Sequence, residues 1–101
     1  MSGYERTGDE IGADVSVIVV DAAPGEGLRL HRHRYREVFV VLEGEATFTL
    51  GEEQRIARAG EIVVAPADVP HRFVNTGHGR LHQVDIHEHP RFETEWLEPS
   101  S

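Results

Sequence analysis

Apolar and polar residues alternate over short stretches through most of the chain. From Val15 onward, turns rich in Gly, Pro or acidic residues separate eight β-rich runs: Val15–Asp21, Leu28–His33, Glu37–Glu43, Glu45–Leu50, Glu53–Arg58, Glu61–Ala65, His71–Asn75 and Arg80–His87. Alternation of this kind is typical of half-buried strands, and short strands at regular spacing indicate an antiparallel sandwich or barrel. The pattern predicts one all-β domain over residues 14–89, and no segment up to residue 89 has a helical period.

The two ends of the chain give weaker signals. Residues 1–13 are polar and lack periodicity, which predicts a flexible N-terminal arm. The tail, residues 90–101, allows two interpretations. Pro90 in a first turn with Phe92 and Trp96 four apart fits a short helix, whereas alternation from Phe92 to Trp96 fits a strand. In either form we expect Trp96, the only Trp, to close one end of the barrel or to pack on a second subunit.

The amino-acid composition excludes several kinds of catalytic and metal-binding site. A chain of 101 residues with 39% hydrophobic and 28% charged residues is ordinary for one soluble domain. It has no Cys, which excludes disulfides, thiolate ligands and cysteine nucleophiles, so any metal must use nitrogen and oxygen ligands. All ten basic residues are Arg, and the absence of Lys excludes Schiff-base chemistry on a lysine.

Charge and hydropathy bear on partners and location. A formal net charge of −8 argues against non-specific binding to nucleic acid or to an anionic membrane. No apolar run approaches membrane-spanning length, and the first residues lack the apolar core of a signal peptide. We therefore expect a cytoplasmic protein with no nucleic-acid or membrane partner.

The histidines carry most of the chemical signal. Because strand residues two apart share a face, His31 and His33 point to the same side. Glu37 opens the returning strand, where it can lie opposite the two imidazoles. Two imidazoles and a carboxylate on adjacent strands form one side of a metal coordination sphere, as in the 2-His-1-carboxylate sites and their three-His relatives. His71, at the start of a later strand, is a fourth candidate.

A solvated strand face is the alternative explanation for an isolated His-x-His. Here, however, the strand that follows is apolar on both faces from Val38 to Leu42, which indicates burial on both sides. A buried and unpaired carboxylate at Glu37 would be costly, so it needs either a cation or an Arg partner. The neighbouring histidines favour the cation.

Two spaced motifs run through this region. The first, Gly-x5-His-x-His-x3-Glu-x6-Gly, is complete, with Gly25, His31, His33, Glu37 and Gly44. The second, Gly-x5-Pro-x-Gly-x2-His-x3-Asn, is met by Gly60, Pro66, His71 and Asn75, with Asp68 in place of Gly. Asp tolerates the left-handed conformations of turns better than most residues. By these motifs residues 15–89 resemble the cupin superfamily, in particular its small single-domain microbial members of the cupin 2 type.

The resemblance implies a double-stranded β-helix, or jelly-roll, barrel with a metal inside one open end and a short C-terminal tail. By position it assigns four metal ligands, His31, His33, Glu37 and His71. The cofactor would be one divalent transition metal, and the sequence does not choose among Fe, Mn, Ni, Zn, Cu and Co. The family also implies a homodimer. Asn75 carries over as a motif residue, interpreted as a turn or second-shell group, and the three motif glycines as turn residues.

Other residues were considered for the substrate pocket. Arg29 has the strand parity of His31, so it either points inward, where it would suit a substrate carboxylate, or lies at the rim beside an acidic residue. Apolar cavity walls are expected from Phe39, Val41, Phe48 and Phe73, which favours a small, partly apolar ligand.

The last strand has two distinct faces. Val84 and Ile86 are typical of core residues, which places Gln83, Asp85 and His87 on the opposite face. If that face lines the cavity, Asp85 and His87 form an acid–base pair or second-shell partners of the ligands. If it faces outward they are surface polar groups, and the pattern slightly favours the surface.

Three functional hypotheses follow. The first is a small metalloenzyme acting on a small organic substrate, with Glu37 as ligand or base and with dioxygenase chemistry slightly ahead of isomerase, lyase or cyclase chemistry. The second is a non-catalytic module that binds a small molecule or a metal, because fold alone does not settle function. A purely structural role ranks last, because it leaves the four-residue set unexplained.

Overall fold

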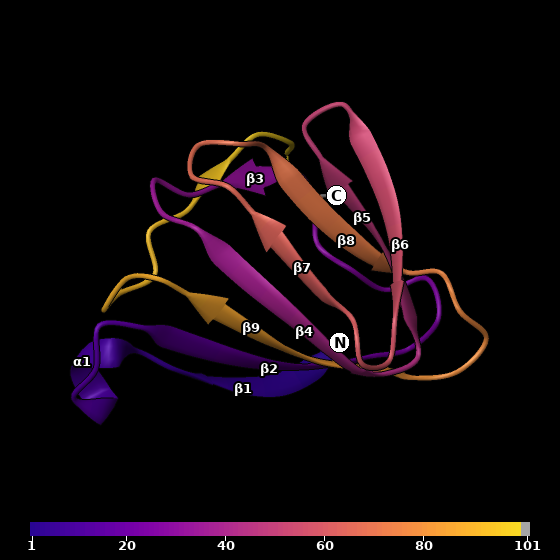
Figure 1. Cartoon of the computed structure of the whole chain (residues 1–101), viewed down its shortest axis with the longest axis horizontal. Helices are drawn as coiled ribbons and strands as arrows, with labels where there is room; N and C mark the ends of the chain where they lie inside the picture. The colour runs from indigo at the N-terminus through magenta and orange to yellow at the C-terminus, as the bar shows by residue number, and fades with distance from the viewer. Residues whose placement is uncertain (100–101) are drawn as a thin grey trace.

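The chain folds into two antiparallel sheets that face each other across a shared interior (Figure 1). A computed structural model describes residues 1–99. Across the first sheet the strands follow the order β1 (Ser2–Arg6), β2 (Ser16–Ala22), β9 (Leu81–His87), β4 (Glu37–Glu43) and β7 (Ile62–Ala65). Across the second the order is β10 (Glu95–Trp96), β3 (His31–Arg32), β8 (His71–Asn75), β5 (Glu45–Leu50) and β6 (Glu53–Arg58). The all-β prediction is confirmed.

The predicted strand bounds hold well in the middle of the chain. The structure reproduces four runs residue for residue, those of β4, β5, β6 and β8. The run Leu28–His33 is different, because only His31–Arg32 forms a strand. The backbone N–H of Leu30 donates to the carboxylate of Glu98 and not to a neighbouring strand. In the tail, Glu95–Trp96 pairs with β3, so the strand interpretation holds for these two residues but not for residues 92–94, and the helix interpretation is wrong.

The N-terminal segment differs from the flexible arm expected for residues 1–13. Ser2–Arg6 pairs along its length with β2 as the edge strand β1. A short helix, α1 (Gly8–Ile11), follows and begins with a capping box between Thr7 and Glu10. No pattern in the sequence predicts β1, because all five of its residues are exposed and show no apolar alternation.

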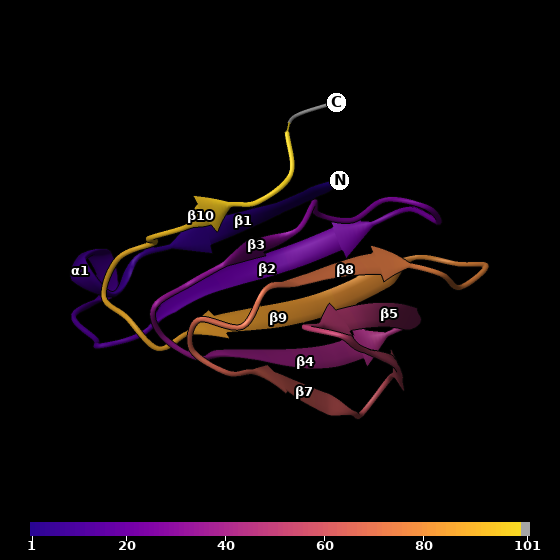
Figure 2. The same cartoon turned by 90° about the horizontal axis from the view of Figure 1, so that it is seen from above.

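The interior has an apolar end and a polar end. The rings of Phe39, Phe48 and Phe73 are almost fully buried and pack together, with the Phe39 and Phe48 centroids 4.9 Å apart. Towards the other end the inward-facing side chains become polar, beginning with Glu37 on β4 and ending with His87 on β9, which are direct cross-strand neighbours. Figure 2 shows the strands of the two termini, β1 and β10, along the same side of the molecule.

Two turn positions rely on the left-handed backbone conformation. Gly44, between β4 and β5, has φ +88°, and a Cβ there would lie 2.3 Å from the carbonyl oxygen of Arg80, so only Gly fits. Asp68 adopts φ +66°, the only positive φ of a non-glycine residue in the described chain. This position is the one where Asp replaces the Gly of the second motif. Within residues 1–99, no helix has the length and apolar character needed to cross a membrane.

Candidate metal centre

Four side chains converge at the polar end of the interior. His31 lies in β3, His33 follows directly after it, Glu37 opens β4 and His71 opens β8. All four are buried, and one nitrogen or oxygen atom from each lies within 4.8 Å of the others. His31 and His71 are direct partners across β3 and β8. The structure thus brings together the four residues proposed as ligands from the sequence.

Backbone carbonyls fix the orientation of three imidazoles. The Nδ1 atoms of His31, His33 and His71 lie 2.9, 2.8 and 3.0 Å from carbonyl oxygens, those of Arg29, Glu93 and Val69 respectively. Because a carbonyl oxygen can only accept, each Nδ1 must carry the hydrogen. In a neutral imidazole the Nε2 atom then presents its lone pair to the centre of the site. This is the arrangement in which proteins hold metal-binding histidines.

The Glu37 carboxylate lies among these Nε2 atoms. Its Oε1 is 3.0 Å from Nε2 of His33 and 3.1 Å from Nε2 of His71. With lone pairs on both sides, these contacts are unfavourable unless a proton or a metal ion lies between the atoms. Among the described residues, Nε2 of His33 has no well-aligned hydrogen-bond partner despite its burial. The donor set, three imidazole nitrogens and one carboxylate, therefore fits a divalent transition metal.

Burial and hydrogen bonding act on the pKa values of the site. Burial alone would raise the pKa of Glu37, but the close approach of the His33, His71 and His87 imidazoles to its carboxylate outweighs burial and holds this pKa well below its usual range. Burial lowers the pKa of His31 to about 4, and the positive charges of neighbouring histidines act in the same direction. Near neutral pH the site therefore presents a carboxylate and a neutral His31, the forms that bind metal ions.

A second pair of residues holds the other oxygen of Glu37. Nε2 of His87 lies 3.2 Å from Oε2 of Glu37, and Nδ1 of His87 lies 2.8 Å from the hydroxyl of Tyr35. The Tyr35 hydroxyl also accepts a hydrogen bond from the backbone N–H of Glu93. Burial raises the pKa of Tyr35 to about 12, so its hydroxyl keeps its proton. The sequence analysis did not select Tyr35, although it shares the odd-numbered parity of His31, His33 and Glu37.

The inner face of β9 corrects the expectation of a polar surface there. Gln83, Asp85 and His87 are buried, and Val84 and Ile86 lie on the outer face of the sheet. Alternation distinguished the two faces correctly, but the apolar face is not the inner one at this end of the molecule. Nε2 of Gln83 donates to Oδ1 of Asp85 over 2.8 Å. Burial raises the pKa of Asp85 well above its usual value, and the nearby charge of Glu37 raises it further.

Asn75 lies four residues along β8 from His71, and its contacts are those of a turn residue. Its amide nitrogen donates to the carbonyl oxygens of Ala22 and Gly79, and its Oδ1 accepts from the N–H of Gly77. These contacts fit the turn interpretation of Asn75. None of its hydrogen bonds among the described residues reaches a candidate ligand.

A cavity of about 310 Å³ opens in front of the cluster. His31, His33, Glu37, Asp85 and His87 contribute to its lining. Its apolar walls come from two sources: Ile18, Val20 and Leu28 on the barrel side, and Phe92 and Trp96 in the C-terminal segment. Met1, Glu5 and Thr94 complete it.

The residues expected as pocket walls lie elsewhere. Phe39, Val41, Phe48 and Phe73 belong to the fully packed core, and none lines the cavity. Phe39 reaches the site only from behind, with its ring centroid 5.8 Å from that of His71. Arg29 does not line the cavity either, because its guanidinium stacks 4.1 Å from the ring centroid of Trp96, beside a separate hollow.

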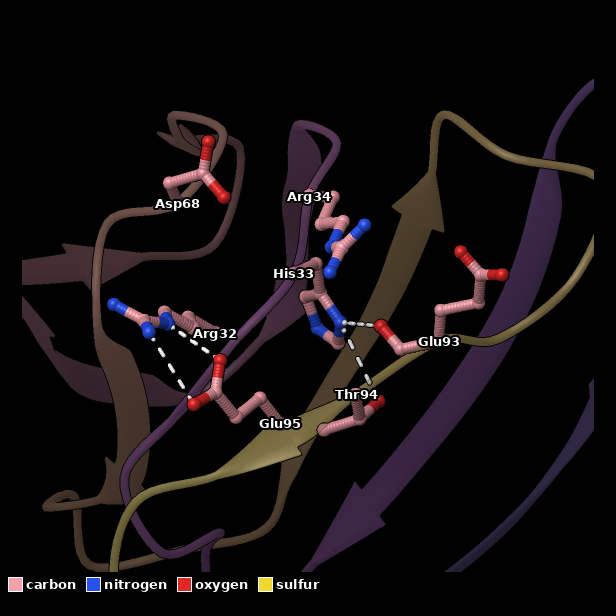
Figure 3. A pocket seen from close by; sticks show the side chains of 7 residues that line it. All are labelled: Arg32, His33, Arg34, Asp68, Glu93, Thr94 and Glu95. Atoms are coloured by element: carbon pink, nitrogen blue, oxygen red, sulfur yellow. Dashed lines mark hydrogen bonds and ion pairs between the residues drawn. The ribbon is translucent and has the colours of Figure 1, made fainter.

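A larger hollow of about 790 Å³ lies on the other side of the C-terminal segment (Figure 3). Its lining is charged, with Arg32 paired to Glu95 at 2.8 Å and with Arg34 and Asp68 nearby. The view shows His33 with its Nδ1 directed to the carbonyl of Glu93 and to Thr94. This hollow therefore meets the back of one imidazole, whereas the smaller cavity meets the ligand atoms.

Comparison with known families gives a match to the model described as "Cupin domain" over residues 18–87. Among curated proteins, mannose-1-phosphate guanylyltransferase 2 of Escherichia coli O157:H7 is 34% identical over 64 residues, which cover 62% of this chain and 13% of that protein. Protein SchB of Streptomyces halstedii is 42% identical over 55 residues, covering 54% of this chain and 40% of SchB. The chain thus spans less than half the length of either relative.

Solved structures show the same fold. A conserved double-stranded β-helix protein from Klebsiella pneumoniae has a TM-score of 0.78 at 25% identity, covering 85% of this chain and 72% of its own. Oxalate oxidase with the substrate analogue glycolate has a TM-score of 0.83 at 25% identity, covering 95% and 54%. Bacillus subtilis oxalate decarboxylase, studied for its Mn(II) centres, has a TM-score of 0.84 at 20% identity, covering 96% and 28%. The expected jelly-roll fold is confirmed.

Proposed function

The chain belongs to the cupin family, and on this basis we propose that it is a metal-dependent enzyme acting on a small organic substrate. The ion would be held by the four converging side chains, His31, His33, Glu37 and His71. One observation carries the proposal: three imidazoles are fixed through Nδ1 so that their Nε2 atoms are free for a cation. Such second-shell hydrogen bonds are what a metal site requires.

The proposed metal is one divalent transition ion, with manganese and iron ahead of the other candidates. Imidazole and carboxylate donors suit both, and the fold occurs in an oxalate decarboxylase with Mn(II) centres. Bound there, such an ion would supply Lewis-acid chemistry or, as iron, activation of dioxygen. We place dioxygenase chemistry ahead of isomerase, lyase or cyclase chemistry, because the ligand atoms face a cavity with largely apolar walls.

The protein residues would divide the remaining tasks. Glu37 acts as a ligand and not as a base, because both of its oxygens already face imidazole nitrogens. Asp85 lines the cavity with a raised pKa, so its carboxyl group can hold a proton for a substrate oxygen. The apolar walls exclude water around the bound substrate.

A homodimer is part of the proposal, and the outer face of the first sheet supports it. Two rows of apolar side chains cross four neighbouring strands there. One row is Val17, Ile86, Val38 and Val64, and the other is Val19, Val84, Val40 and Ile62. None of the eight is fully buried within one chain. Flat β-branched faces of this kind pack against each other about 10 Å apart, so a second copy of the chain is the proposed occupant.

The metal content of the purified protein tests the central claim. We expect about one transition-metal ion per chain after expression in supplemented medium, and a higher melting temperature with metal than after chelation. The His71→Ala variant should lose most of the bound metal, because one of the four ligands is gone. The exposed His78, changed to Ala, is the matched control and should retain it.

Two outcomes would count against this function. Equal metal content in the two histidine variants would show that the ligand set is wrong. Full metal occupancy with no oxygen consumption and no turnover of phenolic or carboxylate substrates would favour the non-catalytic binding module.

A further inference from the structure

The cavity in front of the ligand atoms has aromatic and aliphatic walls and very little surface suited to an anion. Ile18, Val20 and Leu28 form one side, and Phe92 and Trp96 form the other. Trp96 is the most exposed of these, with 46% of the residue accessible to solvent. Its ring centroid lies 5.0 Å from that of His31, so an aromatic surface leads directly to a candidate ligand.

No arginine lines this cavity among residues 1–99, and the chain contains no lysine. The nearest candidate, Arg29, is held on Trp96 beside a different hollow. Arg32 and Arg34 line the charged hollow of Figure 3 on the other side of the C-terminal segment. The ionisable groups of the lining residues are histidines, the carboxyl groups of Glu5, Glu37 and Asp85, and the N-terminal ammonium of Met1, which is already paired with Glu26 at 2.8 Å.

This charge pattern sets a condition on the ligand. A divalent ion together with the Glu37 carboxylate carries one net positive charge, so a singly ionised ligand neutralises the site and a neutral ligand adds no charge to it. A dicarboxylate dianion would bring excess negative charge into a poorly solvated site with no Arg to pair it, which is costly. The net charge of −8 on the chain also opposes the approach of a dianion.

The volume of the cavity and the chemistry of its walls narrow the class of ligand further. A volume of about 310 Å³ lies at the lower end of the range of about 300–1,000 Å³ for small-molecule pockets. That space suits one or two rings, and the walls offer apolar contact and edge-to-face or stacked packing. At the inner end, the metal ligands and Asp85 are the groups that would meet oxygen atoms.

We therefore propose that this cavity takes an uncharged aromatic or enolic compound with adjacent oxygen atoms, and discriminates against small dicarboxylates such as oxalate. The inference rests on the proposed metal site and specifies its substrate class. It separates this chain from the structural neighbours named for oxalate, whose fold it shares.

Cobalt-loaded protein gives the test, because the visible spectrum of Co(II) responds to ligands that bind the ion. Catechol and oxalate are the two probes, since both offer two adjacent oxygens but only oxalate is a dianion near neutral pH. Under anaerobic conditions we expect catechol to bind at least tenfold more tightly. Catechol should also change the emission of Trp96, the only Trp, and oxalate should not.

Wall variants make the test specific. Phe92→Ala should weaken catechol binding and leave oxalate binding unchanged, because it removes an aromatic wall without changing charge. Ile18→Arg, which introduces a cation into the cavity, should shift the preference towards oxalate. Ile56→Arg is the matched control, because Ile56 is 50% exposed on β6 and does not line the cavity. If Ile18→Arg fails to fold, Phe92→Ala still tests the inference.

The possible outcomes distinguish a failure of the proposed metal site from a failure of the proposed substrate class. Failure to take up Co(II) would overturn the proposed metal site and the substrate class with it. Uptake of Co(II) with oxalate bound as tightly as catechol would overturn the substrate class alone. Catechol binding that is unchanged in Phe92→Ala would show that it binds outside this cavity, and would also overturn the inference.

Discussion

At the scale of single residues, the site depends on which nitrogen of each histidine is already engaged. His31, His33 and His71 use Nδ1 for a backbone carbonyl, whereas His87 uses Nδ1 for the Tyr35 hydroxyl. His87 approaches only Oε2 of Glu37, the oxygen that His33 and His71 do not contact. We therefore expect Tyr35 and His87 to act as positioning residues that hold the Glu37 carboxylate in place and leave Oε1 directed to the centre.

Removal of the Tyr35 hydroxyl tests this positioning role. Tyr35→Phe keeps the ring stacked on His33 but frees His87, so Glu37 loses a constraint on Oε2. We expect manganese affinity to fall by about 10–100-fold, as for other second-shell losses, with a changed Mn(II) electron paramagnetic resonance spectrum. Tyr4→Phe, at an exposed tyrosine, is the control. Identical affinity and spectra in the two variants would contradict the role.

The buried carboxyl group of Asp85 predicts a particular dependence of stability on pH. Its pKa is raised in the folded state, so the folded protein binds this proton more tightly than the unfolded chain does. The stabilisation is complete below the unfolded pKa of 3.8 and is lost as the pH rises towards the folded pKa. Asp85→Asn cannot ionise and can still accept from Gln83.

The melting temperature of metal-free Asp85→Asn should therefore exceed that of the wild type by an amount that grows from pH 4 to pH 8 (a range of roughly four units above the ordinary carboxyl pKa). A difference in melting temperature that stays constant across this range would show that ionisation of Asp85 does not destabilise the folded protein.

At the scale of elements, alternation predicted what lies on a strand but not which face is inside. The bounds of β4, β5, β6 and β8 followed from the pattern, because their apolar positions and turns are unambiguous. The four candidate ligands, which the structure brings together, followed from strand parity together with the motif. The inner face of β9 could not be predicted from the pattern. At this end of the molecule the buried side chains are polar and the outward-facing ones are apolar, the reverse of the usual arrangement. β1 could not be predicted either, because it is held by backbone pairing with β2 and its side chains show no alternation of apolar and polar residues.

The turn before β8 provides a test at this scale. Asp68 has φ +66°, and its backbone N–H donates to the carbonyl oxygen of His33 over 2.7 Å. Asp68→Gly should be neutral or stabilising by up to about 1 kcal/mol, whereas Asp68→Ala should cost about 1 kcal/mol, because Ala disfavours positive φ. Urea unfolding would measure both. Ala67→Gly, at a position where φ is not positive, should instead lower the free energy of unfolding. An equal loss of stability in Asp68→Gly and Ala67→Gly would show that the positive φ of Asp68 does not strain the backbone.

At the scale of the whole molecule, the two sheets present different outer faces. The second sheet places Thr, Arg, Gln and Glu side chains outward along with Ile56 and Val74. The first carries the two apolar rows described above, with Val84 near their centre. A chain of this length buries a modest share of its surface on its own. Covering the apolar face with a second copy would add the buried area that one small core lacks.

The mass in solution tests this arrangement. We expect light scattering to give twice the mass of one chain for the wild type. Val84→Arg should give a monomer, because each partner would place a charge in the centre of an apolar interface with no carboxylate opposite it among the two rows. Ile56→Arg, which adds the same charge to the outer face of the other sheet, should leave the dimer intact.

A wild-type monomer at micromolar concentration, or a Val84→Arg dimer as stable as the wild type, would show that the proposed apolar face is not the dimer contact. Of the candidate ligands, Glu37 lies on the inner side of the same sheet, and His31 and His71 belong to the other sheet. The Val84→Arg monomer should therefore still bind metal, which separates assembly from the site.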